Sequence, residues 1–294
     1  MKISFCSIAF RKTDEPLTAI IPSLAEIGYD GVEIWGNHLV GDGSDITAVE
    51  SVLTENNMSV PMISPYFNVT GSKSDWETTL AAAKVYFTYA EALKAPLLRA
   101  FTGFLGSEDV EPDAWRSATS RLRVLCDLAA EKDLAVALET HPRTLVDNVA
   151  AVHRLLEEVA RANLVLNLDI YHMWEKHQDP LWIWEQLKPH VRHVHAKNAL
   201  IPPSDGDEYP LFHDKQGLQE IGGVTYLSGG NMEYKPFIAA LVRDGFSGWL
   251  SIEWFGSDPL VAAEHELRWV KSLLTDDARC AITKTGPRSR RRIR

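Results

Sequence analysis

The stretch Leu134-Ala-Val-Ala-Leu-Glu-Thr-His-Pro142 runs from apolar residues into a carboxylate and an imidazole that stand two positions apart. Side chains of a strand alternate between its two faces, so Glu139 and His141 should point the same way from the end of one strand. A metal ligand and a proton-transfer group could therefore share one pocket at this strand end.

Three later apolar runs contain or end in a side chain that can also bind a metal ion. These are Asp169 at the end of residues 164–169, His195 within residues 191–196, and Glu253 at the end of residues 249–253. If these strands are parallel neighbours in one sheet, their carboxyl ends open on the same side. The four side chains would then converge although they lie far apart in the sequence.

Strand-like and helix-like segments alternate along the whole chain. The expected strands are residues 2–6, 31–35, 60–64, 97–100, 134–142, 164–169, 191–196 and 249–253, and the expected helices are 17–27, 46–56, 76–93, 112–132, 145–159, 181–187, 234–244 and 260–274. Eight such units with nearly continuous apolar strands predict an α/β fold, a single (β/α)₈ barrel. The alternative, a doubly wound sheet, normally carries a glycine-rich first turn for a nucleotide, and this sequence has none.

The charge distribution separates a barrel domain, residues 1–278, from a basic tail, residues 279–294, that we expect to be disordered. Residues 284–294 contain one Lys and five Arg and no acid, so the formal charge of −10 becomes −16 once these six charges are removed. An acidic body is a poor partner for a phosphate backbone, so no nucleic-acid partner is expected. The connection 200–232, rich in Pro, Gly and Asp, is long enough to serve the site.

Composition also indicates the cell compartment. The sequence has no run of about 18 apolar residues, and its first apolar segment is too short for a signal peptide. Its three cysteines, Cys6, Cys126 and Cys280, have no C-x-x-C spacing. We therefore expect a cytoplasmic protein with reduced cysteines and no membrane partner, and we leave a homo-oligomer open.

Three carboxylates and one imidazole form an oxygen-rich ligand set. Such a set suits Mn²⁺ or Mg²⁺ and accommodates Co²⁺ or Zn²⁺ less selectively. A single acid at a strand end is more often a surface residue or an ion-pair partner, but four strand ends with ligands favour a metal. We predict one divalent ion held by Glu139, Asp169, His195 and Glu253.

His141 is the candidate general base, because a neutral imidazole accepts a proton near pH 7. A structural role or metal ligation is the alternative. Arg99 closes its strand at the same level, where its guanidinium could bind a substrate carboxylate or form a structural ion pair. Five more residues could bind substrate at the mouth of the barrel. They could instead only pair with neighbouring groups or line the pocket. These residues are His172, Lys197, Tyr66, His38 and Glu33. Glu33 could instead act in acid–base chemistry or support another site residue.

The chain as far as Leu274 resembles the xylose-isomerase-like, or sugar phosphate isomerase/epimerase, superfamily of metal-dependent TIM barrels. Within it the sequence is similar to the 3-dehydroshikimate dehydratases of bacterial siderophore and quinate pathways. The segments that carry this similarity are Met1–Arg11, Gly31–His38, Leu138-Glu-Thr-His-Pro-Arg-Thr-Leu-Val-Asp147, Asn167-Leu-Asp-Ile-Tyr-His-Met-Trp-Glu175, His193-Val-His-Ala-Lys-Asn198 and Ser251-Ile-Glu-Trp-Phe-Gly256.

The resemblance implies a lyase that dehydrates 3-dehydroshikimate, a carboxylated cyclic hydroxyketone, to protocatechuate. It implies metal ligation by the four strand-end residues, proton abstraction by His141, and substrate contacts for Arg99, His172 and Lys197. The nearest alternative is a sugar or inosose isomerase, epimerase or dehydratase, in which Glu33 would serve as a second acid–base carboxylate. A DNA-repair endonuclease is disfavoured by the acidic body, and a barrel that only binds is disfavoured by the intact ligand set.

Overall fold

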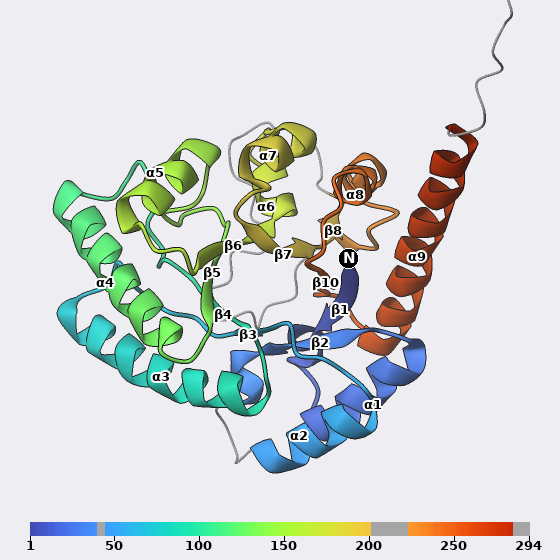
Figure 1. The fold of residues 1–294 in the computed structure, drawn as a ribbon, viewed down its shortest axis with the longest axis horizontal. Helices are drawn as coiled ribbons and strands as arrows, with labels where there is room; N and C mark the ends of the chain where they lie inside the picture. The colour runs from blue at the N-terminus through green and yellow to red at the C-terminus, as the bar shows by residue number, and fades with distance from the viewer. Residues whose placement is uncertain (40–44, 201–222, 285–294) are drawn as a thin grey trace, which may run out of the picture.

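The eight long strands of this protein close into an all-parallel barrel with helices outside it (Figure 1). The computed structural model describes residues 1–39, 45–200 and 223–284, and the side chains of this range up to residue 275. The strands are β1 (Lys2–Cys6), β2 (Gly31–Trp35), β3 (Met62–Ser64), β4 (Leu97–Ala100), β5 (Ala135–Glu139), β6 (Leu164–Asp169), β7 (Val191–Ala196) and β10 (Trp249–Ile252). Their order around the barrel is β1-β10-β7-β6-β5-β4-β3-β2, so the predicted fold is confirmed.

Helices cover the outside of the barrel. They are α1 (Leu17–Ile27), α2 (Ile46–Glu55), α3 (Lys73–Ala92), α4 (Pro112–Ala130), α5 (Val149–Val159), α6 (Ile170–Trp174), α7 (Pro180–Leu187), α8 (Tyr234–Arg243) and α9 (Pro259–Lys284). In α5 the buried residues Val152, Leu155 and Val159 recur at helical spacing and form one apolar stripe toward the core. Every residue of β2, β3, β4 and β6 is buried, as strands covered on both faces should be.

Several expected boundaries were wrong. The helix expected from residue 145 begins at Val149, because the Asn148 side chain accepts a hydrogen bond from Ala151 N at 2.9 Å and caps the helix there. The strand expected over 134–142 ends at Glu139, so His141 lies beyond it. The strand expected over 60–64 is confined to residues 62–64, and the last helix continues from 274 to Lys284.

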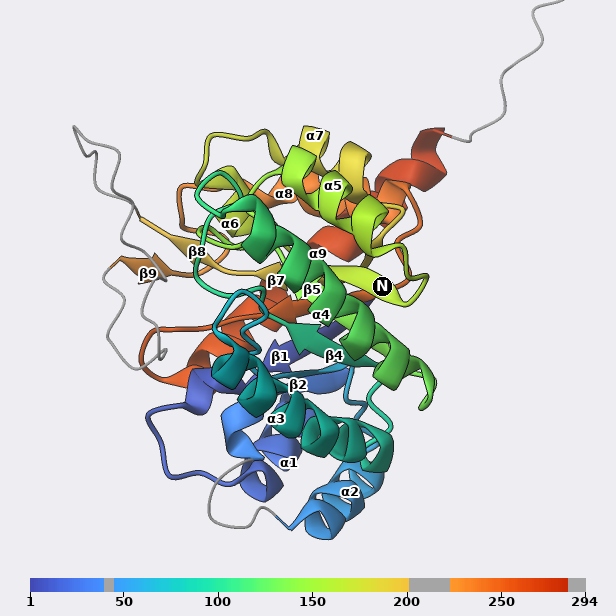
Figure 2. The ribbon, with the colours of Figure 1, turned by 90° about the vertical axis from the view of Figure 1, so that its left-hand side faces the viewer.

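Some short elements have no counterpart in the sequence prediction. The 3₁₀ turns η1 (Ser7–Phe10) and η2 (Gly36–His38) follow β1 and β2, and α6 follows β6 directly. The antiparallel pair β8 (Asn198–Ala199) and β9 (Val224–Thr225) projects from one end of the barrel, as Figure 2 shows. These elements extend the carboxyl ends of the strands, where the predicted site residues lie.

Some predictions fall wholly or partly outside the described residues. The structure does not describe residues 201–222 of the expected site connection or residues 285–294 of the tail. The first tail residues, 279–284, belong to α9. The division into a domain and a tail therefore stays a prediction. Cys6 and Cys126 are buried free thiols. No helix in the described part of the chain is long and apolar enough to cross a membrane.

Candidate active site

Glu139, Asp169, His195 and Glu253 converge at the carboxyl ends of β5, β6, β7 and β10. Each offers a ligand atom within 4.8 Å of those of the others, and all four residues are buried. Strand register produces this arrangement, because Asp169 pairs with His195 and His195 pairs with Ser251, two residues before Glu253. His195 Nδ1 lies 3.9 Å from Glu139, 3.8 Å from Asp169 and 3.4 Å from Glu253. The structure thus brings the predicted quartet together.

Local hydrogen bonds fix the strand ends that carry these groups. Thr140 Oγ1 accepts from Asp169 N at 2.9 Å and donates to Asp169 O at 3.1 Å, which ties the end of β5 to the end of β6. Asp169 Oδ1 accepts from His172 N at 3.1 Å and caps α6. One oxygen of Asp169 therefore orients its carboxylate while the other faces the quartet.

Two buried cations accompany the carboxylates. Lys197 Nζ donates to Asp169 Oδ2 at 2.5 Å and to Glu253 Oε2 at 2.7 Å. Arg99 Nη1 donates to Glu139 Oε2 at 2.6 Å. Arg99 also contacts backbone, with Nη2 donating to Ser64 O at 3.1 Å and Nε donating to Pro65 O at 3.3 Å. The ion-pair alternative is therefore present for both residues, and their substrate contacts stay predictions.

The crowding of like charges perturbs the ionisable groups of the quartet. Burial raises the pKa of Asp169, and Lys197 offsets this only in part because Glu253 raises it further. Burial also tends to raise the pKa of Glu139, but the nearby Arg99, and after it His195, hold the pKa of that carboxyl below its usual value. Burial lowers the pKa of His195, yet Glu253 and Glu33 bring it up to about 9. The cluster thus strongly favours positive charge at its centre.

The donor set fits a divalent cation. The three carboxylates of the quartet and that of Glu33 carry four negative charges, and Arg99 and Lys197 carry two positive charges. With His195 neutral, the site therefore has an excess of two negative charges. An octahedral ion with bonds of about 2.1 Å separates its ligand atoms by roughly 3.0–4.2 Å. The separations between His195 Nδ1 and the three carboxylates, 3.4–3.9 Å, lie within that range.

His141 lies beside this cluster, half-buried among aromatic rings. Its Nδ1 donates to Pro142 O at 2.7 Å, so a neutral ring carries its lone pair on Nε2. The ring centroid is 4.1 Å from that of His172 and 4.9 Å from that of Phe101. His172 Nδ1 in turn lies 2.5 Å from Glu175 Oε1, and burial raises the pKa of Glu175 to about 9. The two imidazoles predicted for the mouth are therefore adjacent.

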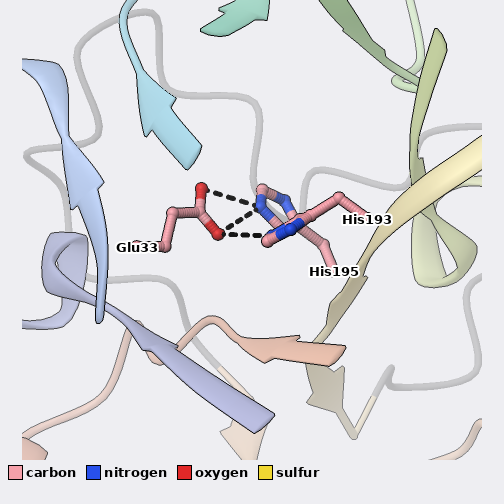
Figure 3. A group of neighbouring side chains, drawn as sticks. All are labelled: Glu33, His193 and His195. Atoms are coloured by element: carbon pink, nitrogen blue, oxygen red, sulfur yellow. Dashed lines mark hydrogen bonds and ion pairs between the residues drawn. The ribbon is translucent and has the colours of Figure 1, made fainter. Parts of the chain in front are cut away.

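Glu33 extends from β2 toward His195 of the quartet (Figure 3). It is fully buried, and its carboxylate accepts from His193 Nε2 at 2.9 Å and from His195 Nε2 at 2.9 Å and 3.0 Å (Figure 3). The Ser64 hydroxyl donates to the same carboxylate. Glu33 thus contacts His195 of the quartet as well as His193 and Ser64.

The remaining predicted contact residues are Tyr66 and His38. Tyr66 is 41% exposed, and its ring lies 4.5 Å from the Arg99 guanidinium and 5.9 Å from the Phe101 ring. His38 Nδ1 lies 2.9 Å from Ser7 Oγ, and burial lowers the pKa of His38 to about 4. Tyr66 therefore forms part of the accessible rim, and His38 contacts Ser7 and the Trp35 ring, whose centroid lies 5.3 Å from its own.

Glu175, Phe101, His193 and Ser64 are among the residues that contact predicted ones and that the sequence reasoning missed. Strand alternation could have found His193, because it precedes His195 by two residues. Helical spacing could have found Glu175, three residues after His172. Phe101 and Ser64 stand at strand ends, but their residue types carry no metal-ligand signal.

An open depression of about 1140 Å³ lies at the opposite end of the barrel, among residues at or before the starts of its strands such as Leu97, Ala135, Val191 and Trp249. It contains none of the predicted site residues. Active sites of such barrels lie at the carboxyl ends of the strands. The chemistry-bearing cluster, not this depression, is therefore the candidate active site.

Comparison with known proteins shows the family of the chain. Residues 21–273 match the family model described as xylose isomerase-like TIM barrel. The chain is 34% identical over 263 residues to the 3-dehydroshikimate dehydratase of Bacillus anthracis, covering 87% of this chain and 91% of that protein. It is 22% identical over 282 residues to an inosose dehydratase of Clostridium botulinum, covering 89% of this chain and 92% of that one.

A solved structure agrees with the sequence matches. The crystal structure of a probable 3-DHS dehydratase involved in petrobactin synthesis, from Bacillus anthracis, superposes with a TM-score of 0.83 at 30% identity. The match covers 92% of this chain and 99% of that chain. The similarity in structure therefore extends over most of both chains.

Proposed function

The chain belongs to the xylose isomerase-like TIM barrel family, and from this membership we propose that it is a divalent-metal-dependent lyase that dehydrates 3-dehydroshikimate to protocatechuate. The resemblance to 3-dehydroshikimate dehydratases read from the sequence is confirmed at 34% identity over most of both chains. The observation that carries the proposal is the buried quartet with His141 beside it.

Glu139, Asp169, His195 and Glu253 would hold the metal. Their three carboxylates and one imidazole suit Mn²⁺ or Mg²⁺, with Co²⁺ or Zn²⁺ as less selective alternatives. A divalent ion bound there would supply Lewis-acid stabilisation of the negative charge that develops on the substrate's keto oxygen, an effect of several kcal/mol.

His141 acts as the general base in this mechanism. The hydrogen bond from its Nδ1 to Pro142 O leaves Nε2 to take the proton on the carbon next to the ketone. The C–H electron pair then forms the new double bond, and the hydroxyl group on the next carbon leaves as water by taking the proton back from His141. A proton shift from the ring methylene to the keto oxygen then yields the aromatic ring. A positioned base contributes roughly 10²- to 10⁴-fold to the rate.

The surrounding side chains orient the substrate. Lys197 and His172 border the quartet, and Tyr66 with Phe101 forms an aromatic wall next to His141. We assign Lys197, His172 and Tyr66 to substrate binding, with the flat ring of the substrate packed against the aromatic wall. The Arg99 guanidinium lies 2.6 Å from Glu139 and supports substrate binding indirectly, by holding that carboxylate in place.

The experiment is a direct assay of purified, metal-loaded protein. With Mn²⁺ or Mg²⁺ present, 3-dehydroshikimate should be converted into a product with the ultraviolet absorbance of a dihydroxybenzoate, and a chelator should stop the reaction. Inosose is the matched control substrate, because inosose dehydratases are among the relatives. Turnover of inosose or of a ketose, with 3-dehydroshikimate left intact, would refute the proposal.

A further inference from the structure

The orientation of the His195 ring distinguishes its two nitrogens. Nδ1 faces the three carboxylates of the quartet at 3.4–3.9 Å. Nε2 points away from them and lies 2.9 Å and 3.0 Å from the two oxygens of Glu33. Because a carboxylate can only accept, Nε2 carries the hydrogen, and a neutral ring must present its lone pair at Nδ1.

Glu33 reaches His195 across the interior of the barrel. It comes from β2, whereas His195 comes from β7, and the strands β1 and β10 stand between them in the barrel order. Figure 3 shows the Glu33 carboxylate extending from its strand toward the two imidazoles. Both Glu33 and His195 are fully buried, so this hydrogen bond has no competition from bulk solvent.

Further contacts fix the Glu33 carboxylate. The Ser64 hydroxyl donates to Oε1, and His193 Nε2 donates to Oε2 at 2.9 Å. Donors on β3 and β7 therefore hold the carboxylate from two sides. A carboxylate fixed in this way can define the direction of the ring to which it is bonded.

We propose that Glu33 is a positioning residue that accepts the Nε2–H of His195 and so presents Nδ1 of that ring to the divalent ion. This inference rests on the metal-dependent function proposed above. Carboxylates hydrogen-bonded to the second nitrogen of a metal-binding imidazole fix its tautomer and raise its basicity. Glu33 then serves the metal site rather than the substrate.

Glu33, His193 and His195 also form a second group of potential ligands within 4.8 Å of one another. A second ion there would need the Nε2 atoms of both imidazoles as ligands. The structure instead uses both atoms in hydrogen bonds to Glu33 at 2.9 Å. The proposal therefore requires one ion per chain, and a count of two would contradict it.

The role of Glu33 also bears on the reaction class. A polyol enzyme with two acid–base carboxylates across its substrate would need Glu33 to face the substrate. Here its carboxylate is bonded to His195, His193 and Ser64 instead. His141 then remains the proposed base for the proton abstraction.

Metal affinity, measured without substrate, tests the proposal. Mn²⁺ binding is followed by competition with a chromophoric chelator for the wild type, Glu33→Gln and Glu33→Ala. We expect one ion per wild-type chain and a dissociation constant raised roughly 10- to 100-fold in Glu33→Ala. The effect should be smaller in Glu33→Gln, because its amide oxygen still accepts from Nε2. Affinities within twofold of the wild type in both variants would overturn the proposal.

Glu266→Gln is the matched control. Glu266 is another buried carboxylate, 1% exposed, but it lies on α9 and accepts from Leu227 N at 2.8 Å. Its replacement should leave metal affinity within twofold of the wild type. A loss equal to that of Glu33→Gln would mean that any buried carboxylate has this effect, and it would refute the specific role of Glu33.

Kinetics separate this role from substrate binding. Saturating Mn²⁺ should restore most of kcat in the Glu33 variants with KM unchanged, whereas a substrate-binding Glu33 would leave KM raised at any metal concentration.

A second measurement uses the wild-type protein in its Zn²⁺-loaded form. The imidazole ¹⁵N chemical shifts of His195 should identify Nδ1 as the metal-bound nitrogen. Metallation of Nε2 would overturn the proposal. Wild-type protein that binds no metal would instead refute the proposed function, and this inference with it.

Discussion

Replacing Arg99 with methionine should destabilise the chain even without substrate, because this guanidinium is the cation that contacts buried Glu139. Arg99 is 2% exposed and donates to Glu139 at 2.6 Å and to two backbone carbonyls, Ser64 O and Pro65 O. Methionine keeps much of the side-chain volume but no donor. The variant would leave a buried carboxylate and two carbonyl groups without these hydrogen bonds.

The expected magnitude follows from the burial of the pair. Removing one partner of a buried ion pair costs about 3–5 kcal/mol. For a chain of 294 residues the unfolding entropy at the midpoint is roughly 0.6 kcal/mol/K, so each kcal/mol lowers the melting temperature by about 1.6 °C. We therefore expect the metal-free variant to melt about 5–8 °C below the wild type.

Differential scanning calorimetry of the metal-free proteins measures this change, with Arg243→Met as the control. Arg243 also contacts carboxylates, Glu185 at 3.1 Å and Asp244 at 2.7 Å, but its side chain is 62% exposed. Exposed pairs contribute about 0–1 kcal/mol, so the control should melt close to the wild type. Saturating Mn²⁺ should narrow the gap for Arg99→Met, because a bound cation compensates part of the charge on Glu139.

A different outcome would show that Arg99 serves the substrate alone. In that case Arg99→Met would melt within about 1 °C of the wild type, while KM for 3-dehydroshikimate rose. Such a result would refute the reasoning from the Arg99–Glu139 contact.

Three further predictions concern the base, the metal and a buried acid. His141→Ala should lose about 10²-fold or more in kcat yet bind Mn²⁺ as the wild type does, whereas Glu139→Ala should lose the metal; equal metal loss in both would reassign His141 as a ligand. Chelation should lower the melting temperature of the wild type and added Mn²⁺ should restore it, and identical melting curves would argue against a bound ion. Burial raises the pKa of Glu266 to about 8 from a usual value of 4.5, so the folded chain retains a proton that the unfolded chain loses. The contribution of Glu266 to stability should therefore fall by roughly 3 kcal/mol between pH 5 and pH 8, and Glu266→Gln should make the pH dependence in urea unfolding less steep; equal slopes would contradict it.

The sequence contained most of the fold because the signals that define a barrel are local. Apolar runs such as Leu164–Asp169 and the helical periodicity of Val149–Val159 each depend on a few neighbouring residues. Boundaries were harder to predict. The apolar residues Leu145 and Val146 suggested an earlier start for α5, but the Asn148 side chain accepts a hydrogen bond from Ala151 N and sets the start at Val149. Parallel strands then place their carboxyl ends together, which is why the quartet could be predicted from strand ends alone.

The partners of the site residues were not local. Arg99 and Glu33 were both expected near substrate, yet the structure pairs Arg99 with Glu139 on the next strand of the barrel and Glu33 with His195 across it. The sequence alone determined which residue types stand at which strand ends. Only the closed barrel decided which of them touch, because ring closure and strand stagger set the distances across the interior, and burial there makes each charged side chain take the nearest group of opposite charge.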